Sequence, residues 1–247
     1  MIKISKKLWV TFIFTVVISG VAVENCFREK LEPTMHPVAM TEQHGKWENP
    51  FLKSSPAYFE AEHFFVWLMA HKKLDDAVGA GSQLDRFNYV SALGPRGMAR
   101  LPDELIEKFV PLMGKMLYSL SDDECANLLR GKVAFNDLQA HELPVLGSFN
   151  ATEARSWFLV TRSAIDAQLN NLPVIPLPKQ TARAGVFKIA GSLPPVDGKL
   201  FLSHLANLQQ ENDENVCSAV RTLFAGTPLL PEPYRAAVAR MLVAGKF

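Results

Sequence analysis

The sequence predicts an all-α fold: a mainly helical globular domain behind an N-terminal signal sequence or membrane anchor. Two observations predict it. Apolar residues recur at spacings of three and four along most of the chain, and the chain opens with a basic segment followed by an uncharged apolar run. The 247 residues are 48% hydrophobic and include 16 Phe, enough to fill the core of one domain. Lys and Arg (26) nearly balance Asp and Glu (25), so no nucleic-acid partner is expected.

The first 23 residues have the order of a signal sequence. Residues 1–7 are basic, and residues 8–23 (LWVTFIFTVVISGVAV) are uncharged and mostly apolar. This run is slightly shorter than the roughly 20 residues that cross a bilayer, and tilt would close the gap. Cleavage and retention as a transmembrane anchor are both consistent with it. In either case the basic residues favour a cytoplasmic N-terminus, so we expect the rest of the chain outside the cytoplasm. The alternative is a buried N-terminal helix of a cytoplasmic protein.

Residues 24–54 are predicted to form a linker or extended arm, because charges, prolines and polar residues alternate there without periodicity. The helical domain should begin at Ser55, which with Pro56 has the order of an N-cap and a first helical residue. We expect its first helix to reach about residue 77 and to be central, because it is rich in aromatic residues. A glycine-rich turn ends it, and a less regular stretch is expected up to Arg100.

Apolar periodicity predicts the next helix over residues 102–117, with a kink at Pro111. Two capping boxes predict the starts of the helices that follow, at residues 121–124 (SDDE) and 150–153 (NATE). In such a box a polar side chain and a carboxylate each satisfy a backbone N–H that has no helical partner.

Three prolines make residues 173–178 (PVIPLP) a connector, because proline lacks the N–H that a helix needs. Residues 184–190 (AGVFKIA) fit one short strand segment or a loop. Three further helices are expected over residues 199–208, 213–225 and 232–244, with glycines at their ends.

The helical domain therefore spans residues 55–247, either as one unit or as two helical units joined by the connector. Residues 117–128 and 208–220 are faintly similar, each with an acidic cluster before a cysteine, and a true duplication there would imply two units. Acidic residues are common at helix starts, which explains the similarity without a duplication.

Cys125 and Cys217 lie near the starts of two predicted helices. In an oxidising compartment they would form one disulfide that closes a long loop. The alternative is a pair of free, buried thiols. We expect the disulfide because the N-terminus predicts export.

Glu60 and His63 are the only candidates for catalysis or metal binding. They lie one helical turn apart, the spacing that carboxylate-bridged di-iron bundles use on two helices. The sequence lacks a second Glu-x-x-His, so a surface histidine is the simpler interpretation. His71, His141 and His204 have no partner that their spacing identifies.

No cofactor is predicted, because the chain has neither a Gly-x-Ser-x-Gly elbow nor a phosphate-binding loop. Lys179, Arg183 and Lys188 form a modest basic cluster beside the connector. Such a cluster fits contact with anionic lipid headgroups or a solvated surface.

These observations favour a non-enzymatic binding or assembly protein of the cell envelope, either secreted or attached to the membrane through its N-terminal segment. Its helical surface would engage another protein. Two alternatives come from other classes. One is an extracytoplasmic hydrolase or metal-dependent enzyme that uses Glu60 and His63, and the other is a small-molecule carrier with an apolar pocket between helices.

Overall fold

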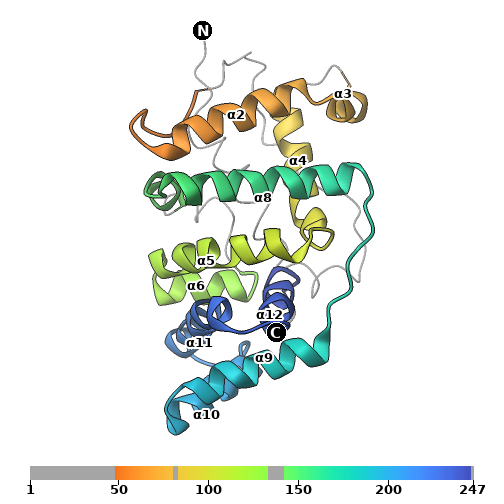
Figure 1. Cartoon of the computed structure of the whole chain (residues 1–247). Helices are drawn as coiled ribbons and strands as arrows, with labels where there is room; N and C mark the ends of the chain where they lie inside the picture. Colours follow the sequence, from red (N-terminus) through yellow and green to blue (C-terminus); the bar gives the residue numbers. More distant parts are fainter. Residues whose placement is uncertain (1–47, 80–82, 133–141, 246–247) are drawn as a thin grey trace.

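The computed structural model describes residues 48–79, 83–132 and 142–245 (Figure 1). These residues are mainly helical and contain no strand, which confirms the all-α prediction. The predicted targeting segment lies outside the described residues. None of the helices within the described ranges combines the length and hydropathy needed to cross a bilayer.

The helices stack in layers. In chain order they are α2 (Pro56–Ala70), α3 (Lys72–Val78), α4 (Gln83–Met98), α5 (Asp103–Ser119), α6 (Asp122–Leu129), α8 (Ala151–Leu169), α9 (Lys179–Ser192), α10 (Pro195–Ala206), α11 (Asp213–Gly226), the 3-10 turn η1 (Thr227–Leu229) and α12 (Tyr234–Val243). Residues 142–147 are also helical. Helix α2 packs on α8, α8 on α5, α5 on α11 and α12, and α12 on α9, with α10 beside α9 (Figure 1). The stack therefore ends in α2 on one side and in α9 and α10 on the other.

Local chemistry sets several helix ends as predicted. Ser121 and Glu124 form a capping box at the start of α6, and Asn150 and Glu153 form another at the start of α8. Gly131 follows α6 with φ 69°, a conformation that glycine adopts without strain. Each of these ends depends on residues that are neighbours in the sequence.

The first predicted helix differs from the observed one in extent and position. It breaks at His71, which is extended (φ −83°, ψ 106°), so α2 and α3 are separate helices. It also forms an end layer instead of the centre of the fold, with Phe59 60% exposed. Phe51, in the segment predicted to be a linker, is buried with its ring centroid 6.5 Å from that of Phe158 on α8.

Two segments that we predicted to be irregular or extended are helical. Residues 83–98 form α4, in which Gly97 meets α8 so closely that a Cβ would lie 1.8 Å from the carbonyl oxygen of Ala164. Residues 184–190 belong to α9, so the strand prediction is wrong. Gly185 lies where α9 crosses α12, and a Cβ there would be 2.5 Å from Val238 Cγ2. In both segments the glycine permits close helix packing.

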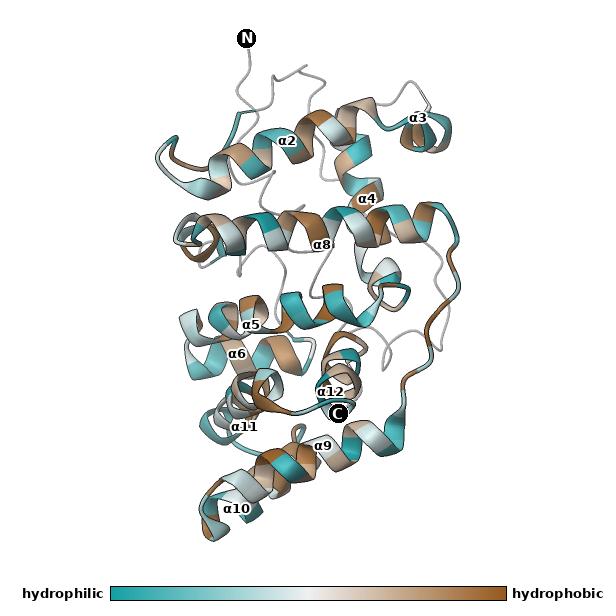
Figure 2. Ribbon diagram, in the orientation of Figure 1, coloured by the Kyte–Doolittle hydropathy of each residue, from teal (hydrophilic) through white to brown (hydrophobic). Residues whose placement is uncertain are grey.

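The connector is extended as predicted and carries apolar side chains on its way from α8 to α9 (Figure 2). Its Val174 and Ile175 are exposed. Of the two glycines expected to end later helices, Gly245 does so with φ 61°. Gly226 instead remains in α11 with φ −77°, and the chain continues into η1.

The expected disulfide is seen in the middle of the stack. It joins Cys125 on α6 to Cys217 on α11, with a Cα–Cα distance of 5.8 Å, and both residues are fully buried. The hydrophobic core extends from there through α5 to Trp157 of α8, which is 0% exposed and has its ring centroid 5.3 Å from that of Phe109. The covalent bond therefore ties α6 to α11, and α11 in turn packs on α5 towards one end of the stack and on α10 at the other.

Candidate functional site

Glu60 and His63, the candidate residues for catalysis or metal binding, both lie on α2. The Glu60 carboxylate is directed towards α8, where its Oε1 is 3.4 Å from Arg155 Nε, while the His63 side chain is exposed. No group of three or more His, Cys, Asp or Glu residues in the described ranges is placed to hold a metal ion. Glu60 would have to leave Arg155 to become a ligand. A metal-dependent activity at these residues stays a prediction.

His63 instead lies in a line of exposed, uncharged side chains along α2. Phe59, His63, Val66 and Ala70 are separated by four, three and four residues, which places them on one side of the helix. Phe59 is 60% and Val66 62% exposed, and His63 and Ala70 are exposed as well. We name these four residues the α2 stripe.

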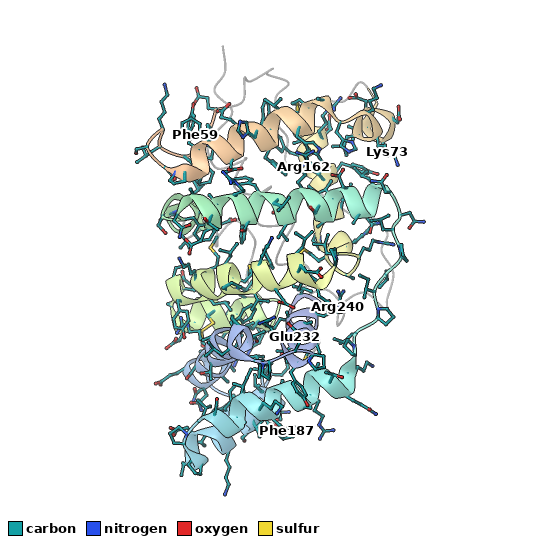
Figure 3. The ribbon with its side chains drawn as sticks, in the orientation of Figure 1. Phe59, Lys73, Arg162, Phe187, Glu232 and Arg240 are labelled. Carbon is teal, nitrogen blue, oxygen red and sulfur yellow. A yellow bond between two sulfur atoms is a disulfide. The ribbon has the colours of Figure 1, made fainter. Side chains whose placement is uncertain are left out.

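The opposite side of α2 explains why the stripe faces outward. Ala57, Ala61, Phe64 and Leu68 are buried, and α2 packs on α8. The start of the helix is fixed by Ser55, whose hydroxyl accepts a hydrogen bond from the Ala57 N–H and donates one to the Gly147 carbonyl at 2.8 Å. The aromatic residues of α2 are thus divided between the core, where Phe64 lies, and the surface, where Phe59 lies on the outer layer (Figure 3).

An open cleft of about 350 Å³ lies where α2, α3 and the end of α8 meet. In it His71 Nε2 is 2.9 Å from Asp166 Oδ1, and Lys73 Nζ donates to Asn170 Oδ1 at 2.6 Å. The Trp67 ring lies between the His71 ring, at 5.2 Å, and the Arg162 guanidinium, at 5.0 Å. These groups contact one another and hold the bend between α2 and α3 against α8. The cleft therefore has a structural explanation.

Two other histidines, His141 and His204, were noted in the sequence. His204 Nδ1 lies 3.2 Å from Glu211 Oε1, near the end of α10. His141 lies outside the described residues. The partners of His71 and His204 become visible only in the structure, because no motif spacing identified them.

A second cleft, of about 400 Å³, lies between α5, η1 and α12. Arg235 Nε donates to Glu107 Oε2 at 2.8 Å and its guanidinium also pairs with Glu232. Burial raises the pKa of Glu107, and the nearby Glu232 carboxylate adds to this shift. The arginine between the two carboxylates ties α12 to α5, a structural role that the sequence analysis did not anticipate.

Glu142 is a buried acid of a different kind. Its side chain is 1% exposed, and within the described chain neither carboxylate oxygen has a hydrogen-bond partner. Burial raises its pKa well above the ordinary value of 4.5, because a charged carboxylate loses its hydration there. By contrast, the buried Arg240 is paired with Asp103, whose Oδ1 is 2.9 Å from Nε, and its Nη2 donates to the Leu101 carbonyl, while Nη1 has no hydrogen-bond partner among the described residues.

Comparison of the chain with protein-family models, with curated proteins and with solved structures found no match. Function is therefore inferred from the residues of this chain alone.

Proposed function

We propose that this chain is a non-enzymatic binding protein of the cell envelope, which works outside the cytoplasm and engages another protein through the α2 stripe. The observation that supports the binding role is the stripe itself: four exposed side chains in line on an end helix, with no charge among Phe59, Val66 and Ala70 and only an imidazole at His63. The centres of protein interfaces are depleted of charged residues and enriched in aromatic ones. Phe59 and Val66, two turns apart on the same side of α2, fit such a centre.

The extracytoplasmic location is supported by the disulfide between Cys125 and Cys217 and by the basic and apolar order of the first 23 residues. Structural disulfides persist mainly in oxidising compartments. The location is tested by the intact mass of the natively expressed protein after thiol alkylation in denaturant without reduction, because both cysteines are buried in the folded protein. We expect both cysteines to be protected from the reagent. Alkylation of both in the unfolded, non-reduced protein would contradict the proposed location.

The binding role is tested by chemical crosslinking in intact cells, followed by purification of the tagged full-length protein. The test variant carries Phe59→Glu and Val66→Glu, because two carboxylates in the stripe would have to be desolvated in an interface. The control variant is Leu229→Glu on η1, where the side chain is 84% exposed and lies elsewhere on the surface.

We expect at least one protein adduct of the wild type to disappear in the double variant and to remain in the control. Both variants should fold normally, because the substituted residues are exposed. Adducts that are the same in all three proteins would overturn the proposal. Adducts lost from the double variant but formed within the chain, to residues 1–47, would show that the stripe binds its own N-terminal segment.

A further inference from the structure

The layer formed by α9 and α10 has a surface unlike the rest of the molecule. Helix α9 packs on α12 and α10 packs on α11, so the layer meets the stack through its inner side, and the two helices also pack on each other (Figure 1). The two helices approach closely at Gly198, where a Cβ would be 2.4 Å from the Ala190 carbonyl oxygen. From the exposed residues of the two helices we select six, which we name the α9–α10 face: Lys179, Arg183, Phe187, Val196, Lys199 and Leu200.

Positive charge is concentrated in this layer. Residues 179–206 contain four Lys or Arg and one Asp, and α9 itself contains no acidic residue. The whole chain has 26 basic and 25 acidic residues, so the remainder of the chain is slightly acidic. The layer is therefore a local excess of positive charge on a nearly neutral protein.

No carboxylate of the described residues neutralises these cations. In the described ranges none of Lys179, Arg183, Lys188 and Lys199 lies within ion-pair distance of a carboxylate. The Arg183 guanidinium instead lies 5.6 Å from the Phe187 ring, and Lys188 Nζ lies 4.7 Å from the Tyr234 ring. Their charge remains available to an anionic partner.

Large apolar side chains lie among these cations. Phe187 is 50% exposed, Val196 68% and Leu200 49%. Lys179, Arg183 and Phe187 follow one another at intervals of four residues on α9, and Val196 and Leu200 do so on α10, so each helix presents a single exposed stripe. Phe59 of the α2 stripe and Phe187 lie at opposite ends of the stack (Figure 3).

We propose that the α9–α10 face is a contact site for an anionic phospholipid bilayer, separate from the α2 stripe. Peripheral membrane surfaces combine Lys and Arg, which bind headgroup phosphates, with aromatic and aliphatic side chains that enter the boundary of the acyl chains. Lys and Arg reach the headgroups while their methylene stems cover apolar surface. An acidic protein would also meet the three cations of the face, but the centres of protein interfaces are depleted of charged residues. Here the cations lie among Phe187, Val196 and Leu200, which favours the bilayer.

The test uses the full-length protein with a photo-reactive benzoylphenylalanine in place of Phe187. It is mixed with phosphatidylcholine vesicles with or without 30% phosphatidylglycerol, and lipid adducts are measured by mass spectrometry. The local probe is needed because the N-terminal apolar segment is itself expected to associate with vesicles. A probe in place of Tyr118 on α5, which is 60% exposed, reports lipid contact away from the face.

We expect lipid adducts at position 187 with the anionic vesicles and few at position 118. Each Lys or Arg near an anionic bilayer strengthens binding roughly fivefold. The triple variant Lys179→Glu, Arg183→Glu, Lys199→Glu should therefore lower lipid adducts at position 187 on the order of a hundredfold. High salt should also lower them, because it screens exposed charges.

The matched control reverses three exposed lysines elsewhere, Lys53→Glu, Lys72→Glu and Lys108→Glu, and changes the net charge by the same amount. It should leave the adducts at position 187 intact. Equal loss in both triple variants, equal adducts with neutral vesicles, or adducts at position 187 to protein in place of lipid would each overturn the proposal. None of these results depends on whether the α2 stripe binds a protein.

Discussion

At one end of the stack α2 lies on α8, and at the other α9 lies on α12. Both ends are supported by a glycine at a close helix crossing, Gly97 beneath the first and Gly185 beneath the second. Their outer surfaces differ in charge: the α2 stripe is uncharged, whereas the α9–α10 face carries three cations. Packing constrains only the inner side of an end layer, so the outer sides of the two layers can carry different residues. We therefore expect the two ends to respond differently to salt, pH and substitution.

The largest effect is expected at the centre that the two ends share. Replacing Cys125 and Cys217 by Ser removes a link between residues 92 positions apart, which the chain-entropy model values at about 4–5 kcal/mol of unfolding free energy. Urea unfolding measures the loss, and hydrogen exchange should show that both ends lose protection. Cys26→Ser is the control and should be neutral. Loss of protection at only one end would show that the disulfide does not support both.

A second prediction compares the glycines at the helix contacts near each end. Gly97→Ala should lower the unfolding free energy by about 2–3 kcal/mol, because a Cβ would lie 1.8 Å from a backbone oxygen. Gly198→Ala, where the distance is 2.4 Å, should cost about 1–2 kcal/mol. Gly191→Ala on α9 meets nothing within 4 Å and should be neutral or stabilising by up to about 1 kcal/mol. Thermal or urea unfolding ranks the three, and an equal cost at all three would contradict the close contacts.

The third prediction concerns pH at the α2 end, where the helical segment that begins with Glu142 meets the start of α2 through Gly147 and Ser55. Burial raises the pKa of Glu142 in the folded state, so the unfolded chain loses this proton first as pH rises above about 4.5. Stability should then fall with rising pH. Glu142→Gln removes this fall, so its advantage over the wild type should grow between pH 5 and pH 8 in urea unfolding.

Glu153→Gln should change the pH dependence of stability in the opposite direction. Lys115 lowers the pKa of Glu153, so its contribution is present above about pH 4.5 and is lost as pH falls through the lower, folded-state pKa. This variant should be less stable than the wild type at pH 7, and the difference should shrink in acid. The same pH trend in both variants would contradict the environments assigned to the two carboxylates.

The smallest effect is expected at Glu60 and His63. His63→Ala changes an exposed side chain and should alter the unfolding free energy by less than about 0.5 kcal/mol. Glu60→Ala loses a surface ion pair with Arg155 and should cost at most about 1 kcal/mol. Metal analysis of the purified proteins should give the same result for both variants and the wild type. A metal present in the wild type and absent from both variants would favour the enzyme alternative.

The sequence predicted those features that depend on adjacent residues. The caps at Ser121 and Asn150 were predictable because their partners are three residues away. The disulfide was predictable because export leaves few pairings for three cysteines, of which Cys26 lies outside the predicted domain. Helix α4 was missed because Pro95 and Gly97 disfavour a helix locally, whereas the contact with α8 favours one there.

The candidate surfaces were less predictable. The strand prediction for residues 184–190 failed because a short apolar run does not distinguish a strand from a helix. His71 was noted in the sequence, but its partner Asp166 is 95 residues away. Whether Phe59 and Phe187 are exposed depends on which layers end the stack, and this follows from the tertiary arrangement alone.

One experiment compares the two ends of the stack in two strains of the same cell type. Benzoylphenylalanine is placed at Phe59 in one strain and at Phe187 in another, both in the full-length protein, and adducts are identified by mass spectrometry after brief irradiation. We predict protein adducts at position 59 and phospholipid adducts at position 187. The same class of adduct at both positions, or none at either, would contradict the view that the two ends of the stack bind different partners.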